Sequence, residues 1–204
     1  MCQAHGWPSS GPDADKPAYD DVIQGSSGIA HAFELQTGTP ALAPTLVADK
    51  VSGLTITYAV MAALFHRERT GEGQFVEVPM IDALTSFTLV EHGCAAIPDP
   101  PLGPAGYPRI TAPDRRPFRT LDGWLSVLPY SAANYDDLFR EGGRTDLVGH
   151  AMVQTARERN RNAAELYAAV APIVGAIDGA VDATPADAAA DAAADACGRS
   201  GRWG

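Results

Sequence analysis

Apolar residues are densest between Leu54 and Phe65, and the charged segment from His66 to Arg69 follows directly. A nearly continuous apolar run of this length is typical of a helix that is buried on most sides. Ser52 has the side chain of an N-cap residue, and Gly71 or Gly73 can take the positive φ that ends a helix. We therefore predict a largely buried helix that begins near Ser52 and ends at the glycines.

The pattern changes after this helix. Apolar and polar residues alternate from Gln74 to Val78, which indicates a short strand, and an apolar stretch follows from Met80 to Leu89. Phe118–Thr120 and Trp124–Leu128 flank the dipeptide Asp122-Gly123, which predicts a β-hairpin with a type I′ turn. Two more helices are predicted, over Asn134–Arg140 and Ala163–Ile177.

Composition divides the chain into five segments. Prolines recur from Pro98 to Pro117, so this stretch is predicted as an irregular linker. Alanine and aspartate dominate the end of the chain with almost no large apolar residue, which favours disorder. The predicted segments are a Pro/Gly-rich lead (1–18), an α/β block (19–97), the linker (98–117), a second block (118–177) and an Ala/Asp-rich tail (178–204).

Asp49 is the candidate catalytic residue of the first block. It precedes the predicted buried helix, where free backbone N–H groups can hold a carboxylate in its charged form. A helix-capping aspartate is the alternative that composition alone favours.

Four separated motifs carry a resemblance to a known family. They are PAYDDVIQGSSG from Pro17, D-x-x-S-G at Asp49, AALFHRERTGEGQFVEVPMIDAL from Ala62, and RRPFRTLDGWLSVLPY from Arg115. In this order and spacing they resemble the class III CoA transferases (CaiB/BaiF type), which include formyl-CoA and carnitine CoA transferases. The likeness covers about residues 3 to 175.

The resemblance implies an enzyme that moves CoA between an acyl-CoA thioester and a carboxylic acid. Asp49 would be the nucleophile that forms an aspartyl mixed anhydride, with the N–H groups of Lys50 to Gly53 as candidate donors to the oxyanion. No permanently bound cofactor and no metal are expected, and coenzyme A enters as substrate.

Other positions match CoA-contacting parts of the family. By this likeness, Lys16, Tyr19 and Met80 are candidate CoA-binding residues, and Gly103 and Gly106 are candidates for a glycine-rich substrate loop. The structural alternatives are a solvated loop lysine, a half-buried tyrosine and a core methionine. The loop departs from the family's tetraglycine form, which leaves the acyl substrate open.

The resemblance also implies an α/β fold of which this chain holds a part. The predicted part is a portion of the large α/β domain plus the small domain, without the family's N-terminal nucleotide-binding units. A catalytically inactive fragment with residual CoA or dimer binding is therefore one alternative, and a homodimer is left open. The other alternative is an α-methylacyl-CoA racemase, whose proton-transferring histidine would align with Tyr19. Because phenol has a pKa near 10 and imidazole near 6.5, Tyr19 favours the transferase.

Charge and composition exclude several other classes. The net charge of −10 and the pI near 4.8 argue against binding to nucleic acid or to an anionic membrane. The histidines and the three cysteines form no metal-ligand pattern. We find no signal peptide and expect no apolar span of 18 residues, so a cytoplasmic location is expected.

Overall fold

The computed structural model describes residues 1–178, which form two compact units that divide between Pro113 and Asp114. That division falls inside the predicted linker, and residues 98–117 form neither helix nor strand. Apart from Asp178, the predicted tail of residues 178–204 lies outside the described residues. Each unit is described by itself below.

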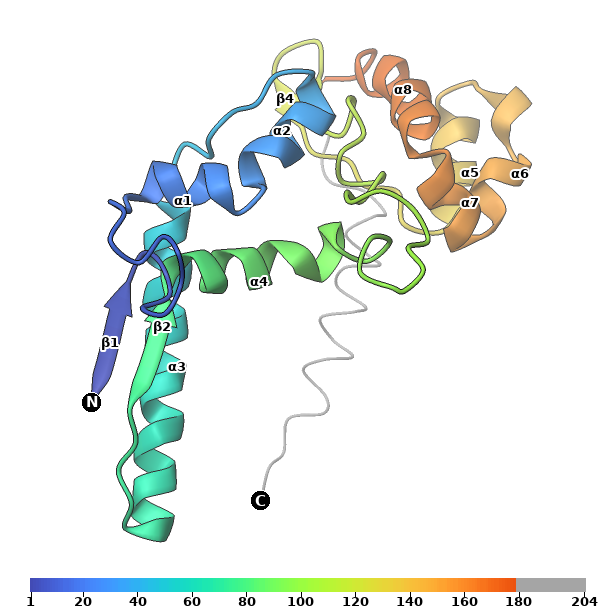
Figure 1. Ribbon diagram of the computed structural model, residues 1–204. Helices are drawn as coiled ribbons and strands as arrows, with labels where there is room; N and C mark the ends of the chain where they lie inside the picture. Colours follow the sequence, from blue (N-terminus) through green and yellow to red (C-terminus); the bar gives the residue numbers. More distant parts are fainter. Residues whose placement is uncertain (179–204) are drawn as a thin grey trace. The chain divides into compact units, whose positions relative to one another are not determined.

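Unit 1 combines four helices with a two-stranded parallel sheet. Its elements are β1 (Cys2–His5), α1 (Asp20–Ser26), α2 (Ile29–Thr37), α3 (Val47–Thr70), β2 (Val76–Pro79) and α4 (Met80–His92). In Figure 1, α1, α3 and α4 meet near the N-terminal end of α3, and β2 runs beside α3. The strand predicted over residues 74–78 is confirmed as β2. The segment predicted as a lead contains β1, which pairs with β2 in a register that places Cys2 opposite Val76.

The carboxylate of Glu77 ties the two strands to the loop that follows β1. Its Oε1 accepts a hydrogen bond from the Ser9 amide at 2.6 Å and lies 2.7 Å from Nε2 of His5. These contacts, the Ser9 backbone donor first, then the Ser9 side chain and His5, hold the pKa of Glu77 below its ordinary value. The loop is therefore attached to β2 most firmly while Glu77 is ionised.

The core of unit 1 lies at the N-terminal end of α3. Ile23 of α1, Ala48 of α3 and Leu84 of α4 have no exposed surface. Partly buried apolar side chains pack around them: Trp7, Ala18, Ile29, Val47, Val51, Met80 and Ile81. This small cluster joins three helices, so it fixes the position of the first turns of α3.

Helix α3 begins earlier than predicted and ends where predicted. It starts at Val47, and Ser52 lies inside it, where its hydroxyl donates to the Ala48 carbonyl at 2.6 Å. The prediction of Ser52 as N-cap is therefore wrong, because the helix extends back into the core cluster. Gly71 caps the C-terminus with φ 77°, which confirms the predicted glycine stop.

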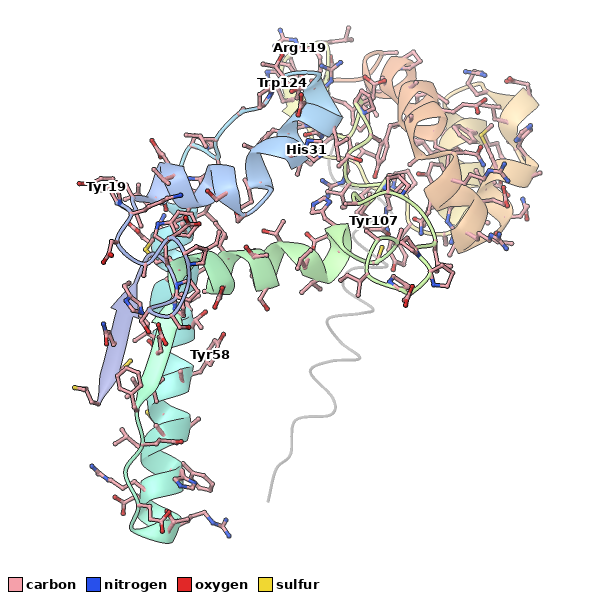
Figure 2. The ribbon with its side chains drawn as sticks, in the orientation of Figure 1. Tyr19, His31, Tyr58, Tyr107, Arg119 and Trp124 are labelled. Carbon is pink, nitrogen blue, oxygen red and sulfur yellow. The ribbon has the colours of Figure 1, made fainter. Side chains whose placement is uncertain are left out.

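The prediction that this helix is largely buried is wrong for the described residues. Only Ala48 and Ser52 of α3 are buried. An apolar stripe on one face, spaced four, three and four residues apart, is exposed: Leu54 69%, Tyr58 63%, Met61 62% and Phe65 64%. Figure 2 shows Tyr58 projecting from the helix. The pattern correctly identified an apolar helix, but burial depends on what packs against it.

By length and composition alone, α3 could also cross a membrane. The mean hydropathy of its most apolar 18-residue window is 1.2, with 11% of that window buried. The expectation of no such apolar span is therefore wrong. The core helix of a water-soluble protein can pass the same test, so this finding is weak evidence for a membrane segment.

Unit 2 joins a hairpin to a group of short helices. Its elements are β3 (Phe118–Arg119), β4 (Trp124–Leu125), α5 (Ala132–Glu141), the 3₁₀ helix η1 (Thr145–Leu147), α6 (Ala151–Gln154), α7 (Ala156–Arg161) and α8 (Ala163–Val174). The predicted hairpin and the two predicted helices, α5 and α8, are confirmed. The type I′ turn is wrong, because Gly123 lacks a positive φ. A longer loop joins the strands, in which the Gly123 amide donates to the Thr120 hydroxyl.

We predict that charging the α3 stripe reduces its attraction for apolar surfaces. Leu54→Glu combined with Met61→Glu should lower hydrophobic-dye binding and self-association, and should leave the free energy of unfolding within about 0.5 kcal/mol, because both side chains are mostly exposed. Leu84→Ala, at the buried core, should instead cost about 2 to 5 kcal/mol. A wild-type chain that is monodisperse and binds no dye would contradict the prediction.

We predict that Glu77 makes unit 1 acid-sensitive. Because its pKa is lowered in the folded state, its contribution is fully present above the ordinary glutamate pKa and is lost as the pH falls through the lowered value. Glu77→Gln should therefore reduce stability at neutral pH and flatten its decline in acid, as measured by thermal melts across pH. Glu72→Gln, at an exposed residue between α3 and β2, serves as the control and should follow the wild-type curve.

Candidate active site

Asp49 lies in the first turn of α3 with its side chain exposed. The N-cap position belongs to Leu46, so the alternative that Asp49 caps the helix is wrong. A carboxylate in this turn is stabilised by the positive end of the helix dipole. The local sequence therefore places a solvent-accessible carboxylate on the residue that follows the buried Ala48.

Leu46, the N-cap residue of α3, has no side-chain hydrogen bond to the helix, and Asp20 of α1 supplies that acceptor instead. Asp20 is 6% exposed as a residue, and its Oδ1 accepts a hydrogen bond from the Asp49 amide at 3.0 Å. Oδ2 accepts a second bond from Nε2 of Gln24 at 2.5 Å. The buried carboxylate of Asp20 therefore holds the backbone of Asp49 in place, and the Asp49 side chain extends from a fixed point.

Gln24 extends the same network to the segment before α3. Its Nε2 also donates to the Thr45 carbonyl at 3.2 Å, and its Oε1 accepts from the Ala43 amide at 2.8 Å. Asp20 and Gln24 are four residues apart on one face of α1 and flank the buried Ile23. Our sequence analysis missed both residues, although this i, i+4 polar pair beside an apolar residue was a readable signal.

The structure brings two of the predicted CoA-binding residues, Tyr19 and Met80, to the same end of unit 1 as Asp49. Tyr19 is 73% exposed at the N-cap of α1, next to Asp20, and Figure 2 shows it pointing outward. Met80 packs against the core cluster that contains Ala48, the residue before Asp49. Lys16 is exposed in the loop that leads to Tyr19, with Nζ 2.5 Å from Oδ1 of Asp13.

The two glycines of the predicted substrate loop lie elsewhere. The Gly106 amide donates to the His92 carbonyl at 2.7 Å, and the Gly103 amide donates to the Ala95 carbonyl at 3.1 Å. These bonds attach the loop to the C-terminal end of α4, whereas Met80 starts that helix. At about 1.5 Å per residue the two ends of α4 are roughly 20 Å apart. The structure therefore does not bring Gly103 and Gly106 together with Asp49.

The predicted oxyanion donors are already engaged. Lys50 to Gly53 lie within α3, and the Lys50 amide donates to the Leu46 carbonyl at 3.2 Å. Amides inside a helix bond to the carbonyl one turn earlier. That expectation is wrong, because the helix begins before Asp49.

Residues 1–178 contain no group of three or more His, Cys, Asp or Glu side chains that could hold a metal ion. The site around Asp49 combines an exposed carboxylate, whose backbone amide is held by Asp20, with Tyr19 beside Asp20 and Met80 on the core cluster.

Comparisons with known proteins agree with the motif resemblance. The sequence profile of CoA-transferase family III matches residues 1–192. The chain is 33% identical over 170 residues to a protein of Mycobacterium tuberculosis named "Probable fatty acyl-CoA transferase Rv3272", covering 78% of this chain and 43% of that protein. It is 33% identical over 142 residues to the succinate–glutarate CoA-transferase of Agrobacterium fabrum, covering 68% of this chain and 34% of that enzyme.

Solved structures show the same likeness in three dimensions. The crystal structure of the M. tuberculosis protein matches with a TM-score of 0.67 and 27% identity, over 87% of this chain and 47% of that one. A CaiB/BaiF family protein from Brucella suis matches in fold, with a TM-score of 0.65 and 22% identity, over 95% of this chain and 50% of that one. The chain thus spans half or less of the length of these relatives.

We predict that Asp20 stabilises the start of α3. Asp20→Ala leaves the Asp49 amide and Gln24 without their shared partner, which should cost about 1 to 3 kcal/mol of unfolding free energy. Hydrogen exchange at the Asp49 amide should become faster. The matched control is Asp21→Ala at the exposed neighbour on α1, which should stay within about 0.5 kcal/mol. Equal losses in both variants would contradict the capping role.

Proposed function

The chain belongs to CoA-transferase family III, and from this premise we propose that it moves CoA between an acyl-CoA thioester and a carboxylic acid, with Asp49 as nucleophile. The observation that carries the proposal is the exposed carboxylate of Asp49 in the first turn of α3, on a residue whose backbone amide is held by Asp20. Relatives that share 33% identity are named as CoA transferases, which supports the reaction class.

In the proposed first step, a carboxylate oxygen of Asp49 attacks the carbonyl carbon of the thioester. The C–S bond breaks, the CoA thiolate leaves, and Asp49 carries the acyl group as a mixed anhydride. The thiolate then attacks the Asp49 carbonyl carbon of this anhydride, which releases the donor acid and leaves an aspartyl-CoA thioester. The acceptor carboxylate attacks that thioester, which gives a second mixed anhydride and free CoA thiolate. The thiolate attacks the acyl carbonyl carbon of the acceptor, so that the new acyl-CoA forms and the Asp49 carboxylate is regenerated. This sequence of steps needs no proton source, metal or redox partner, because each step replaces one acyl bond with another.

Positioning is the protein's main contribution to such a step, because a carboxylate is a weak nucleophile. Holding a reacting group in the correct geometry can contribute roughly 7 to 11 kcal/mol. Asp20 supports this role by fixing the backbone of Asp49 from a buried site. Asp20 is thus a positioning residue in the proposal, and Asp49 is the catalytic one.

Tyr19, Met80 and Lys16 are the proposed CoA contacts. Tyr19 and Met80 lie at the Asp49 end of unit 1, and Lys16 lies in the preceding loop, where its ammonium could meet a phosphate of CoA. Its present pairing with Asp13 is an exposed i, i+3 contact, which is weak enough to exchange for a ligand phosphate.

Binding without turnover is the second candidate function. The exposure of Asp49 favours it, because a carboxylate that keeps its water shell attacks a thioester poorly. In this case the chain would bind CoA through the same residues and release no free acid through a covalent step.

We predict that incubation with succinyl-CoA releases one CoA thiol per chain and adds one succinyl mass at Asp49. Asp49→Asn should abolish both signals, since the amide cannot form the anhydride. Asp82→Asn is the matched control, because Asp82 is also an exposed residue in the first turn of a helix, α4, and it should react like wild type.

The same experiment separates the two candidates. Thiol release in a single burst followed by CoA transfer to added glutarate supports the transferase. Calorimetric binding of CoA without thiol release supports the binding-only function. Thiol release at wild-type rate from Asp49→Asn would remove Asp49 from the mechanism.

A further inference from the structure

Unit 2 contains a cavity of about 310 Å³ that the proposed reaction at Asp49 does not use. Chain segments before β3 and after β4 form its walls together with α8. The lining residues are Arg115, Arg116, Pro117, Ser126, Val127, Leu128 and Tyr167. Its volume lies at the lower end of the range for small-molecule sites, about 300 to 1,000 Å³.

The charged part of the lining is the pair Arg115 and Arg116. Arg116 contacts Oδ1 of Asp114 at 3.2 Å, but the Arg116 side chain is 69% exposed, so this ion pair is weak and can exchange for a ligand. A guanidinium binds a carboxylate or phosphate through two parallel N–H donors. The two arginines therefore suit an anionic group that carries two or more oxygens.

The hairpin beside these arginines contains a third arginine, Arg119. The guanidinium of Arg119 lies over the Trp124 ring at 5.5 Å, and both side chains are labelled in Figure 2. Residues 114–128 carry three arginines against two aspartates, in a chain whose net charge is −10. One of those aspartates, Asp122, accepts a hydrogen bond from Thr120 inside the turn. Residues 114–128 therefore carry a net charge of +1, against −10 for the whole chain.

The other walls of the cavity are mostly apolar. Pro117, Val127, Leu128 and Tyr167 contribute them, and Tyr167 is the most buried lining residue, at 2% exposed. A bare inorganic anion would contact the arginines and leave these walls unused. A ligand that fills the site needs an apolar body attached to its anionic group.

We propose that this cavity binds the carboxylate of a small organic acid with a short apolar chain. The arginines hold the carboxylate, and the aliphatic chain packs against Val127, Leu128 and Tyr167. The proposal does not depend on the transferase reaction, because binding here needs neither an acyl-CoA nor Asp49.

The test uses hexanoate as the probe and amide NMR of the full chain as the readout. Hexanoate should produce saturable shifts at Ser126 to Leu128 and at Tyr167. Arg115→Ala combined with Arg116→Ala should raise the Kd by about ten- to a hundredfold, the loss expected for hydrogen bonds to a charged group. Arg157→Ala on α7, an exposed arginine away from the cavity lining, is the control and should bind hexanoate like wild type.

Two further probes decide which chemistry is recognised. Hexanol keeps the chain without the charge, and inorganic phosphate keeps the charge without the chain, so both should bind at least about tenfold more weakly than hexanoate. Hexanol or phosphate binding as tightly as hexanoate would overturn the proposal. So would the absence of saturable shifts with wild type, or an unchanged Kd in a double variant that melts like wild type.

Discussion

The carboxylate of Asp20 is buried between α1 and α3, where it accepts hydrogen bonds from the Asp49 amide and from Gln24. A buried carboxylate is costly unless its oxygens are paired, and the first turn of a helix offers unpaired N–H groups. The Asp20 carboxylate needs donors and the first turn of α3 needs an acceptor, so one hydrogen bond satisfies both and holds α1 and α3 in one relative position. Because Ile23 and Ala48 lie next to these polar residues and pack together, the core and the site depend on the same contact.

Local signals predicted the parts of the fold that local chemistry determines. Gly71 ends α3 because glycine takes a positive φ freely, and the hairpin forms where two β-rich segments flank a turn. The missed features depend on residues far apart in sequence. Strand β1 exists because Cys2 pairs with a strand at Val76, and α3 starts at Val47 because α1 provides its cap and core. No pattern within a short window contains that information.

The same distinction applies to the candidate site. Asp49 was identifiable from the D-x-x-S-G motif. The structure shows that its backbone is held by Asp20, which lies in a second motif, PAYDDVIQGSSG. Met80 was assigned to CoA, and it packs on the core beneath Asp49, so its structural role and its proposed role are compatible. Gly103 and Gly106 were grouped with the site by likeness alone, and the hydrogen bonds of their loop place them at the far end of α4.

Two exposed features of unit 1 have the same physical requirement. The apolar stripe of α3 is stabilised by removal from water, and a mixed anhydride at Asp49 survives only where water is excluded. Both features belong to α3 but to different faces: at about 100° per residue, Asp49 lies roughly 150° around the helix from the centre of the stripe, so covering both takes contacts on two sides of α3. The matched relatives have more than twice the length that aligns here, with 43% of one sequence and 47% of its crystal structure covered. The described residues therefore hold the backbone of Asp49 in place, whereas its side chain is exposed, and the proposed reaction would need that side chain to be shielded from water.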